Sequence, residues 1–531
     1  MLASFARIRR AARRSPLEAT LALAAISVGL YVLAAPLAAS RYPPMTDLPF
    51  HAAQAATFRH YWDPAYHFHE QFELHPLQSP YMGVYALGAA LMLVFPPVLA
   101  VKITLAALLG LVPAGLAVMF HGMKKSPLLG LMGLGICWGN LTHWGFTNYV
   151  GALGLFAMTV GLTLLVLDRP TGRRRVALAL CLVALFFMHI FRFPFGIAAV
   201  VGTAVVMFPV TRRIRPILLP MLPSLALFAL WWKLRPAALD GALGPLSFHL
   251  ERLPGEFLGA VVDGFTTKVA ARALLVDFDV AYAVAVVCLL ASALRALHGR
   301  RVTGWEVGVT VVPLVCAAVF LALFLILPMR LGLWWYVYPR EAVAATMVLF
   351  GACPDLPRAP WLRVPLVLAL GLGGLGAARA VAREYATFQP QTDDFDRITA
   401  RLPQAPRLFY MVFEHGGTSR STSPFMHLPA WVQAQKGGWL SWHFAVWNAS
   451  PVTFRPRGQP GSTVTPMTPP RWEWTPEQIR SPATFDALTP FYDWFLVRKR
   501  DAPDDLFQRD PTIQRVDHQG LWWLYKRAGR G

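Results

Sequence analysis

Charged residues are scarce in this chain of 531 residues, where Asp, Glu, Lys and Arg together make up only 15%. A soluble enzyme of this length needs a more polar surface, so the composition excludes that class. Cysteine is rarer still, with five scattered residues and no Cys-x-x-Cys pair. We therefore expect no disulfide framework and interpret the cysteines as small buried apolar residues. No internal repeat is found, which disfavours an inverted-repeat transporter.

Hydrophobic residues make up 55% of the chain. Apolar runs of about 18 or more residues alternate with short basic loops, a pattern typical of a polytopic helical membrane protein. The first run, at 17–39, follows five arginines and is too long for the apolar core of a signal peptide, so we interpret it as an uncleaved span. The net charge of +20 is divided among the short loops, so we expect no nucleic-acid partner.

About eleven spans are predicted, at 17–39, 98–120, 127–143, 149–167, 176–191, 194–210, 216–233, 278–297, 305–328, 341–353 and 363–380. Every second loop between them is basic, which predicts a cytoplasmic N-terminus in the bacterial inner membrane. Residues 81–96 are interpreted as an apolar helix that lies in the membrane or dips into it. If that helix crossed fully, one further span would be needed to keep the charge pattern.

The character of the sequence changes near residue 384, where long apolar runs stop. We expect a mostly α protein with two parts: a transmembrane domain at 1–383, whose first outside loop is 40–97, and a soluble extracytoplasmic α/β domain at 384–531. Predicted strands lie at 407–413, 494–498 and 521–526, and 425–436 is predicted to be helix or loop. Residues 448–476, rich in Pro, Thr and Arg, are expected to form an ordered loop.

The first outside loop concentrates the chemistry of the chain. Five of the fourteen histidines lie there, accompanied by four carboxylates: His51, His60, His67, His69 and His75, with Asp47, Asp63, Glu70 and Glu73. Imidazoles and carboxylates held beside a membrane are suited to acid–base catalysis or to metal binding. The loop is therefore the candidate active site.

Asp47 and His51 form the candidate catalytic pair. Asp47 precedes an alanine-rich run and is followed by Pro49, which predicts a helix with Asp47 at its N-cap. One helical turn then places the His51 imidazole above the Asp47 carboxylate. The alternative is that Asp47 is only a cap and His51 only a surface residue.

A divalent-metal site is the second prediction for this loop. An extended His67-Phe68-His69 segment would place both rings on one side, and Glu70 and His75 could complete the ligands. This mixture suits Zn, Mn or Mg, although the spacing matches no strict motif such as His-Glu-x-x-His. The alternative is a polar surface above the membrane.

These features resemble the GT-C superfamily of membrane glycosyltransferases. The resemblance rests on a basic N-terminus, one span, a large first outside loop with an early Asp, juxtamembrane helices, about eleven spans and a soluble C-terminal domain. The stretch Thr-Asp-Leu-Pro-Phe-His at 46–51 looks like the start of that loop in uncharacterised bacterial GT-C-like proteins. Residues 144–149 (Trp-Gly-Phe-Thr-Asn-Tyr) and 189–193 (His-Ile-Phe-Arg-Phe) also look like stretches of such proteins.

The resemblance implies an inverting transfer of a sugar from a polyprenyl-phosphate-linked donor to a cell-envelope glycan, lipid or protein. Asp47 would match the general base, and cations would receive the lipid phosphate. The candidates for that seat lie at the outer ends of spans: Arg340, Arg330 and Arg192. The loop 233–277, with Arg252, Lys268 and Arg272, would help to close over the donor. The loop departs from many metal-using members in having no Asp-x-Asp pair.

Two other classes remain open from the sequence. One is a non-catalytic GT-C-like scaffold for envelope assembly, in which the fold is kept and the chemistry lost. The other is a lipid or glycan transporter, which the scarcity of charge at mid-membrane depth disfavours.

Overall fold

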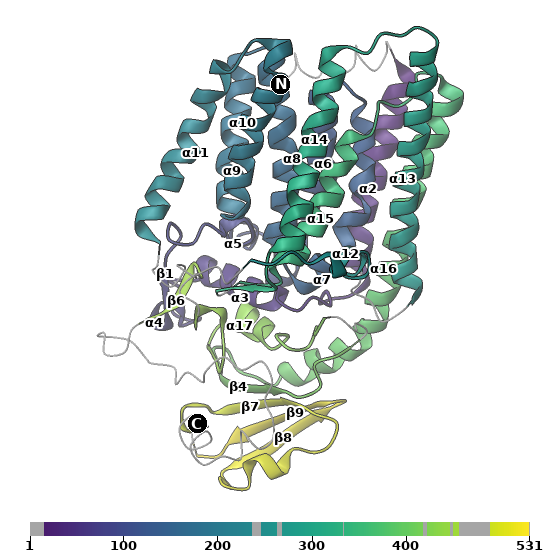
Figure 1. Ribbon diagram of the computed structural model, residues 1–531. Coiled ribbons are helices and arrows are strands. Elements are labelled where there is room, and N and C mark those ends of the chain that lie inside the picture. Colours follow the sequence, from purple (N-terminus) through teal and green to yellow (C-terminus); the bar gives the residue numbers. More distant parts are fainter. Residues whose placement is uncertain are drawn as a thin grey trace.

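The computed structural model describes residues 15–235, 246–262, 268–332, 334–417, 422–446, 450–455 and 489–529. A helical bundle forms most of the molecule, and a sheet domain lies at one end of it (Figure 1). Eight helices of the described chain are long and apolar enough to cross a membrane: α2 (Pro16–Ala39), α6 (Pro97–Gly122), α8 (Thr147–Asp168), α10 (Arg192–Thr211), α11 (Arg215–Leu234), α13 (Lys268–Leu297), α14 (Gly304–Ile326) and α16 (Pro360–Thr399). The chain is a multi-pass membrane protein.

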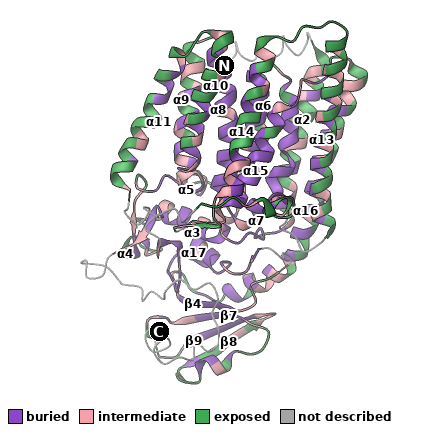
Figure 2. Cartoon of the chain, in the orientation of Figure 1, coloured by how far each residue is buried: buried purple, intermediate pink, exposed green. Residues whose placement is uncertain are grey.

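Burial within the bundle separates central from peripheral helices. In its most apolar window α8 is 83% buried, whereas α2 and α11 are each 28% buried. Figure 2 shows exposed residues along the outward faces of α11 and α13. Large apolar side chains such as Leu219 on α11 and Leu290 on α13 are exposed there. An apolar surface of this extent requires lipid as its solvent.

Three further predicted spans correspond to shorter elements, so the number eleven stays a prediction. The segment predicted at 176–191 is α9 (Gly172–Met188), and 341–353 lies in α15 (Val337–Leu349) and the 3₁₀ turn η5 (Phe350–Ala352). The α-helix expected at 127–143 is wrong, because the chain forms η1 (Pro127–Gly133), η2 (Gly135–Trp138) and the short α7 (Asn140–Trp144). A Cβ on Gly130 would lie 2.6 Å from the carbonyl oxygen of Pro113, so glycine lets this segment pack directly on α6.

The first outside loop folds across the end of the bundle. It contains α3 (Leu48–Arg59), α4 (Phe68–Gln71), β1 (Phe72–Leu74) and α5 (Met82–Leu91). The ten residues of α5 are about 15 Å long, too short to cross a bilayer core of about 30 Å. Other elements at this end are η4 (Leu250–Arg252), α12 (Gly255–Val262), and the antiparallel pair β2 (Arg330–Leu331) and β3 (Trp334–Trp335).

The C-terminal domain is built on a five-stranded sheet with the order β5-β4-β7-β9-β8. The predicted strands are confirmed as β4 (Arg407–Val412), β7 (Trp494–Arg498) and β9 (Trp522–Arg527), and the structure adds β5 (Trp439–Leu440) and β8 (Ile513–Gln519). β4 is parallel to β5 and β7, and the other pairs are antiparallel. Helix α17 (Ala430–Lys436) precedes β5, and the 3₁₀ turns are η6 (Phe444–Val446), η7 (Thr489–Phe491) and η8 (Asp504–Phe507).

Two connections outside this sheet bear on the domain boundaries. Within the predicted loop at 448–476, β6 (Val452–Phe454) pairs antiparallel with β1 of the first outside loop. The remainder of that loop, 448–449 and 456–476, lies outside the described residues. Helix α16 runs unbroken through the predicted boundary at residue 384.

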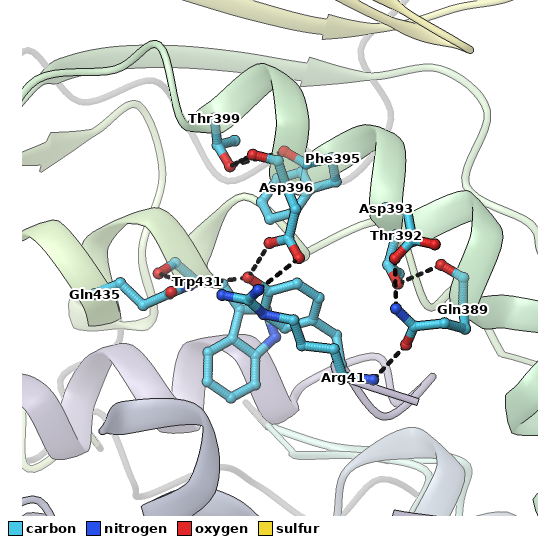
Figure 3. Close-up of polar contacts among 10 residues, drawn as sticks. Arg41, Gln389, Thr392, Asp393, Phe395, Asp396, Thr399, Trp431 and Gln435 are labelled. Atoms are coloured by element: carbon cyan, nitrogen blue, oxygen red, sulfur yellow. Dashed lines mark hydrogen bonds and ion pairs between the residues drawn. The ribbon is translucent and has the colours of Figure 1, made fainter. Parts of the chain in front are cut away.

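A polar clasp ties the chain that follows α2 to the outer half of α16 and to α17. Figure 3 shows Arg41 directed toward Asp396, and the guanidinium Nη1 lies 3.0 Å from Oδ2. The buried Tyr42 donates its hydroxyl to Asp396 Oδ1 at 2.6 Å and accepts from Gln435 at 3.1 Å. The C-terminal domain is thereby docked beside the first outside loop.

Helices α6 and α8 approach so closely that only glycine fits between them. A Cβ on Gly154 would lie 2.2 Å from the carbonyl oxygen of Leu111, and one on Gly122 would lie 2.3 Å from that of Gly161. Small residues at such positions are what allow helix backbones to meet in a membrane.

We expect Gly154→Ala to lower the free energy of unfolding by about 1–3 kcal/mol, because the methyl group forces the two backbones apart. The matched control is Gly202→Ala on α10, where an added Cβ meets no atom within 4 Å. Denaturation of both purified variants in detergent checks this. Equal stability of the two would contradict the close approach of α6 and α8.

Candidate active site

The backbone of Asp47 is held by hydrogen bonds to a distant part of the chain. The amide of Thr46 donates to the carbonyl of His143 at 3.0 Å, and that of Asp47 donates to the carbonyl of Trp144 at 3.1 Å. Gly145 follows with a φ of +93°, and a Cβ there would lie 2.8 Å from that of Asp47. Glycine is needed at 145 for both reasons.

The side chain of Asp47 is not used to cap its helix. Asp47 occupies the N-cap position of α3, as predicted, but its carboxylate makes no capping hydrogen bond. Its backbone is αR rather than extended, the conformation in which N-cap side chains usually reach the first amides. The carboxylate is therefore free of the helix amides and can interact with other groups.

Burial raises the pKa of Asp47 to about 7, while the positive charge of Arg340 acts to lower it. The side chain keeps 22% of its surface exposed, so it is enclosed without being sealed. A carboxylate with a pKa near neutrality is well matched to accepting a proton at physiological pH.

His51 is placed near Asp47 on α3 but is engaged elsewhere. Its Nδ1 is 2.9 Å from the hydroxyl of Tyr85 on α5, and its Nε2 is 3.2 Å from the carbonyl oxygen of Gly145. Burial lowers the pKa of His51 to about 4, so the ring is neutral at pH 7. Its position indicates that it joins α3, α5 and the Gly145 turn.

The imidazole that does face Asp47 is His427, which the sequence analysis missed. Its Nε2 lies 3.7 Å from Oδ1 of Asp47, and its side chain is 3% exposed. His427 belongs to the C-terminal domain, between β4 and α17. Nothing in the local sequence Ser-Pro-Phe-Met-His-Leu-Pro at 423–429 signals this role.

Arg340, whose charge acts on Asp47, lies near the start of α15. Its guanidinium lies 4.1 Å from the ring centre of Phe146, and its Nη2 donates to the carbonyl of Trp335 at 2.9 Å. Tyr149 donates its hydroxyl to the carbonyl of Arg340 at 2.7 Å, which joins α8 to α15. A cation is therefore fixed close to the carboxylate.

Arg192 forms a second buried cation, paired with Glu341 on α15. The two side chains are 3% and 6% exposed, and the Arg192 guanidinium lies 4.8 Å from the ring centre of Tyr149. Within the described residues, Arg192 Nε and Nη1, Arg340 Nε and Glu341 Oε2 have no hydrogen-bond partner. Buried donors without partners are costly unless a ligand or water satisfies them.

The remaining predicted cations lie apart from this centre. Arg330 is exposed on β2, and its Nε donates to the carbonyl of Gly332 at 3.0 Å. Arg252 is buried and donates to the carbonyls of Phe324 and Leu327 at the end of α14, so it is a structural residue. In the predicted closing loop, 236–245 and 263–267 lie outside the described residues, while Lys268 and Arg272 are exposed on α13.

The predicted metal site is not supported. In the part of the chain that the structure describes, no group of three or more His, Cys, Asp or Glu side chains could hold a metal ion. His67 has a φ of +55° and begins α4, so the segment is not extended and the rings of His67 and His69 do not share one side. Instead His67 pairs with Glu70 at 2.6 Å, and His75 with Glu73 at 3.5 Å.

The fold is similar to that of a solved membrane protein that aligns over nearly the whole chain. Over 96% of its length the chain superposes on 98% of ArnT from Cupriavidus metallidurans bound to undecaprenyl phosphate, with a TM-score of 0.53 and 12% identity. The arabinofuranosyltransferase AftD from Mycobacteria is similar over 96% of this chain and 40% of its own, with a TM-score of 0.46 and 15% identity. No protein-family model and no curated protein sequence matches the chain.

We expect Arg340→Gln to raise the pKa of Asp47 above about 7, because the guanidinium is the charge that stabilises the carboxylate. The pH dependence of carbodiimide modification of Asp47, followed by mass spectrometry, measures this directly, since the reagent reacts with the protonated acid. Arg330→Gln removes an exposed cation and should leave the profile unchanged. An unshifted profile in Arg340→Gln would contradict the pairing.

Proposed function

We propose that the chain is a membrane glycosyltransferase that moves a sugar from a polyprenyl-phosphate-linked donor to a cell-envelope acceptor with inversion at the anomeric carbon. The observation that carries the proposal is the position of Asp47, whose pKa is raised to about 7, within the electrostatic influence of Arg340 on α15, which in turn neighbours the buried Arg192 on α10. A base and a cationic seat are the two elements that attack on a sugar phosphate needs.

In the proposed step the acceptor hydroxyl lies against Asp47. Its oxygen attacks the anomeric carbon while Asp47 takes the proton, and the bond from that carbon to the phosphate oxygen breaks. The polyprenyl phosphate leaves with the electron pair of that bond. Arg340, with its Nε lacking a partner among the described residues, stabilises the negative charge that grows on the leaving group.

Arg192 and Glu341 neighbour Arg340 and belong to the same proposed phosphate-binding site. Because Glu341 neutralises one side of the guanidinium, Arg192 holds the α10–α15 junction and offers its Nε and Nη1 to a phosphate. Arg330, exposed at the β2–β3 hairpin just before α15, is placed in the proposal as an outer cation met by the donor on entry. The ArnT structure was determined with undecaprenyl phosphate bound, which supports a lipid phosphate as the leaving group.

The proposed setting is the bacterial cytoplasmic membrane, with the first outside loop and the domain at 384–531 on the extracytoplasmic side. The clasp between Arg41, Tyr42 and Asp396 joins these two regions, so they share one side of the membrane. The acceptor would then be an envelope glycan, lipid or protein.

We expect Asp47→Asn to lower turnover by about 10²–10⁴-fold, because the acceptor hydroxyl loses its proton acceptor. The assay uses the full chain in nanodiscs, a panel of polyprenyl-phosphate pentoses and hexoses, and an envelope extract as acceptor. Its readout is released polyprenyl phosphate, the product common to every donor. The matched control is Asp63→Asn, since Asp63 belongs to the same loop but pairs with His60 at 3.3 Å. Turnover of Asp47→Asn at the unmodified rate would contradict the assignment.

The rate should also depend on pH in a defined direction. Because the pKa of Asp47 is raised to about 7, the carboxylate is protonated and inactive below that pH and is available as a base above it. We therefore expect kcat/KM to rise with pH and to level off above about 7. A pH–rate profile recorded with saturating acceptor checks this, and a flat profile between pH 5 and 8 would rule out a base of this pKa.

A further inference from the structure

A short segment of the C-terminal domain, residues 422–428, reaches the start of the first outside loop at Thr46 and Asp47. The amide of Ser423 donates to the hydroxyl oxygen of Thr46 at 3.1 Å, and His427 Nε2 lies 3.7 Å from Oδ1 of Asp47. Two consecutive residues of the first outside loop are therefore met by two residues of the C-terminal domain. The contacts join parts of the chain that are 377 residues apart in the case of Thr46 and Ser423.

The His427 ring is fixed by aromatic packing. It stacks on Trp442 with ring centres 5.1 Å apart and planes at 12°, and it meets the edge of Phe50 at 4.8 Å. Trp442 follows β5, and Phe50 lies one turn along α3 from Asp47. The position of the imidazole is thus set by the sheet domain on one side and by the helix that begins at Asp47 on the other.

We propose that His427 is a positioning residue for Asp47, and that the C-terminal domain completes the active site by supplying it. In the tautomer with hydrogen on Nε2, His427 donates to Oδ1 of Asp47 and leaves Oδ2 to face the acceptor hydroxyl. A short rotation of the carboxylate closes the 3.7 Å separation to a hydrogen bond, and bonds of this kind commonly tighten when substrate binds. This inference rests on the proposed function.

A neutral partner suits this task better than a cation. Burial, and then the neighbouring His415 and His51, hold the pKa of His427 well below its usual value, so the ring is uncharged at pH 7. A neutral donor orients the carboxylate while lowering its basicity less than an arginine or lysine would. Two further titratable groups interact with Asp47. The charge of Arg340 on α15 lowers the pKa of Asp47, and the charge of Asp47 helps to raise the pKa of Tyr85 on α5.

The test separates the donor from the packing of the ring. His427→Phe keeps an aromatic ring and His427→Met a side chain of similar length, but neither can donate, whereas His427→Gln keeps an N–H near the position of Nε2. We expect kcat to fall by about 10- to 100-fold in His427→Phe and His427→Met, with little change in the KM for donor, and to recover most of its value in His427→Gln.

A second readout does not depend on turnover. Loss of the donor removes a hydrogen bond to the ionised form of Asp47, so the carbodiimide profile of Asp47 should shift to higher pH in His427→Phe. The matched control is His443→Phe, because His443 is equally buried, lies 5.4 Å from Phe50, and faces Phe72 at 5.0 Å. That variant should lose stability without moving the profile.

The outcomes distinguish the two proposals. If Asp47→Asn is inactive while a folded donor-free variant at 427 keeps the unmodified rate and Asp47 profile, the positioning role is overturned and the proposed function stands. If Asp47→Asn keeps full turnover, the proposed function itself fails. A shift in the Asp47 profile with His427→Phe and none with His443→Phe supports the positioning role, whatever the turnover of Asp47→Asn.

Discussion

The hydrogen bonds between the backbones of Thr46–Asp47 and His143–Trp144 are the link on which the candidate site depends. They anchor the start of α3 to the end of α7. The carboxylate of Asp47 makes no capping hydrogen bond to α3. The link is possible only because Gly145 turns with a positive φ and has no side chain to strike Asp47. From this point the chain continues into α8, whose Tyr149 donates to the carbonyl of Arg340 and so connects the Asp47 turn to α15.

The charged groups around this link fall into two sets. In the first, Asp47 faces the neutral ring of His427, and the neutral ring of His51 lies one turn along α3; burial lowers the pKa of both imidazoles. In the second, Arg340 and Arg192 pack against aromatic rings, and Arg192 is paired with Glu341. Were an arginine in direct contact with Asp47, the carboxylate would be a weaker base and the cation less available to a phosphate.

The parts of this site that the sequence predicts are those encoded locally. A proline, an Asp and an alanine-rich run are neighbours in the chain, so the helix start at Asp47 can be inferred without a partner. The pairing of Arg192 with Glu341 joins residues 149 positions apart, and no local pattern encodes it. His427 escapes prediction for the same reason, since its role follows from where the sheet domain docks.

Two other local patterns depend on contacts that the sequence does not show. The histidine-rich stretch predicts a metal site, whereas in the structure His67, with its left-handed backbone, pairs with Glu70, and His75 pairs with Glu73. The apolar segment at 127–143 suggests an α-helix because composition reports length and polarity rather than helical pitch. The close packing of Gly130 on α6 and the 3₁₀ turns of this segment depend on tertiary contacts, which the local sequence does not reveal.

Helix α16 explains how the C-terminal domain is held close to the candidate active site. Its 40 residues span about 60 Å, roughly twice the thickness of a bilayer core, so its second half projects beyond the bundle. That projecting half carries Asp396, which binds Arg41 and Tyr42, a few residues before Asp47 in the chain. The clasp fixes the position of the sheet domain relative to the helical bundle, and with it the position of His427 relative to Asp47. Since the clasp contacts residues 41 and 42 and His427 faces Asp47, a movement of the C-terminal domain would also displace Asp47.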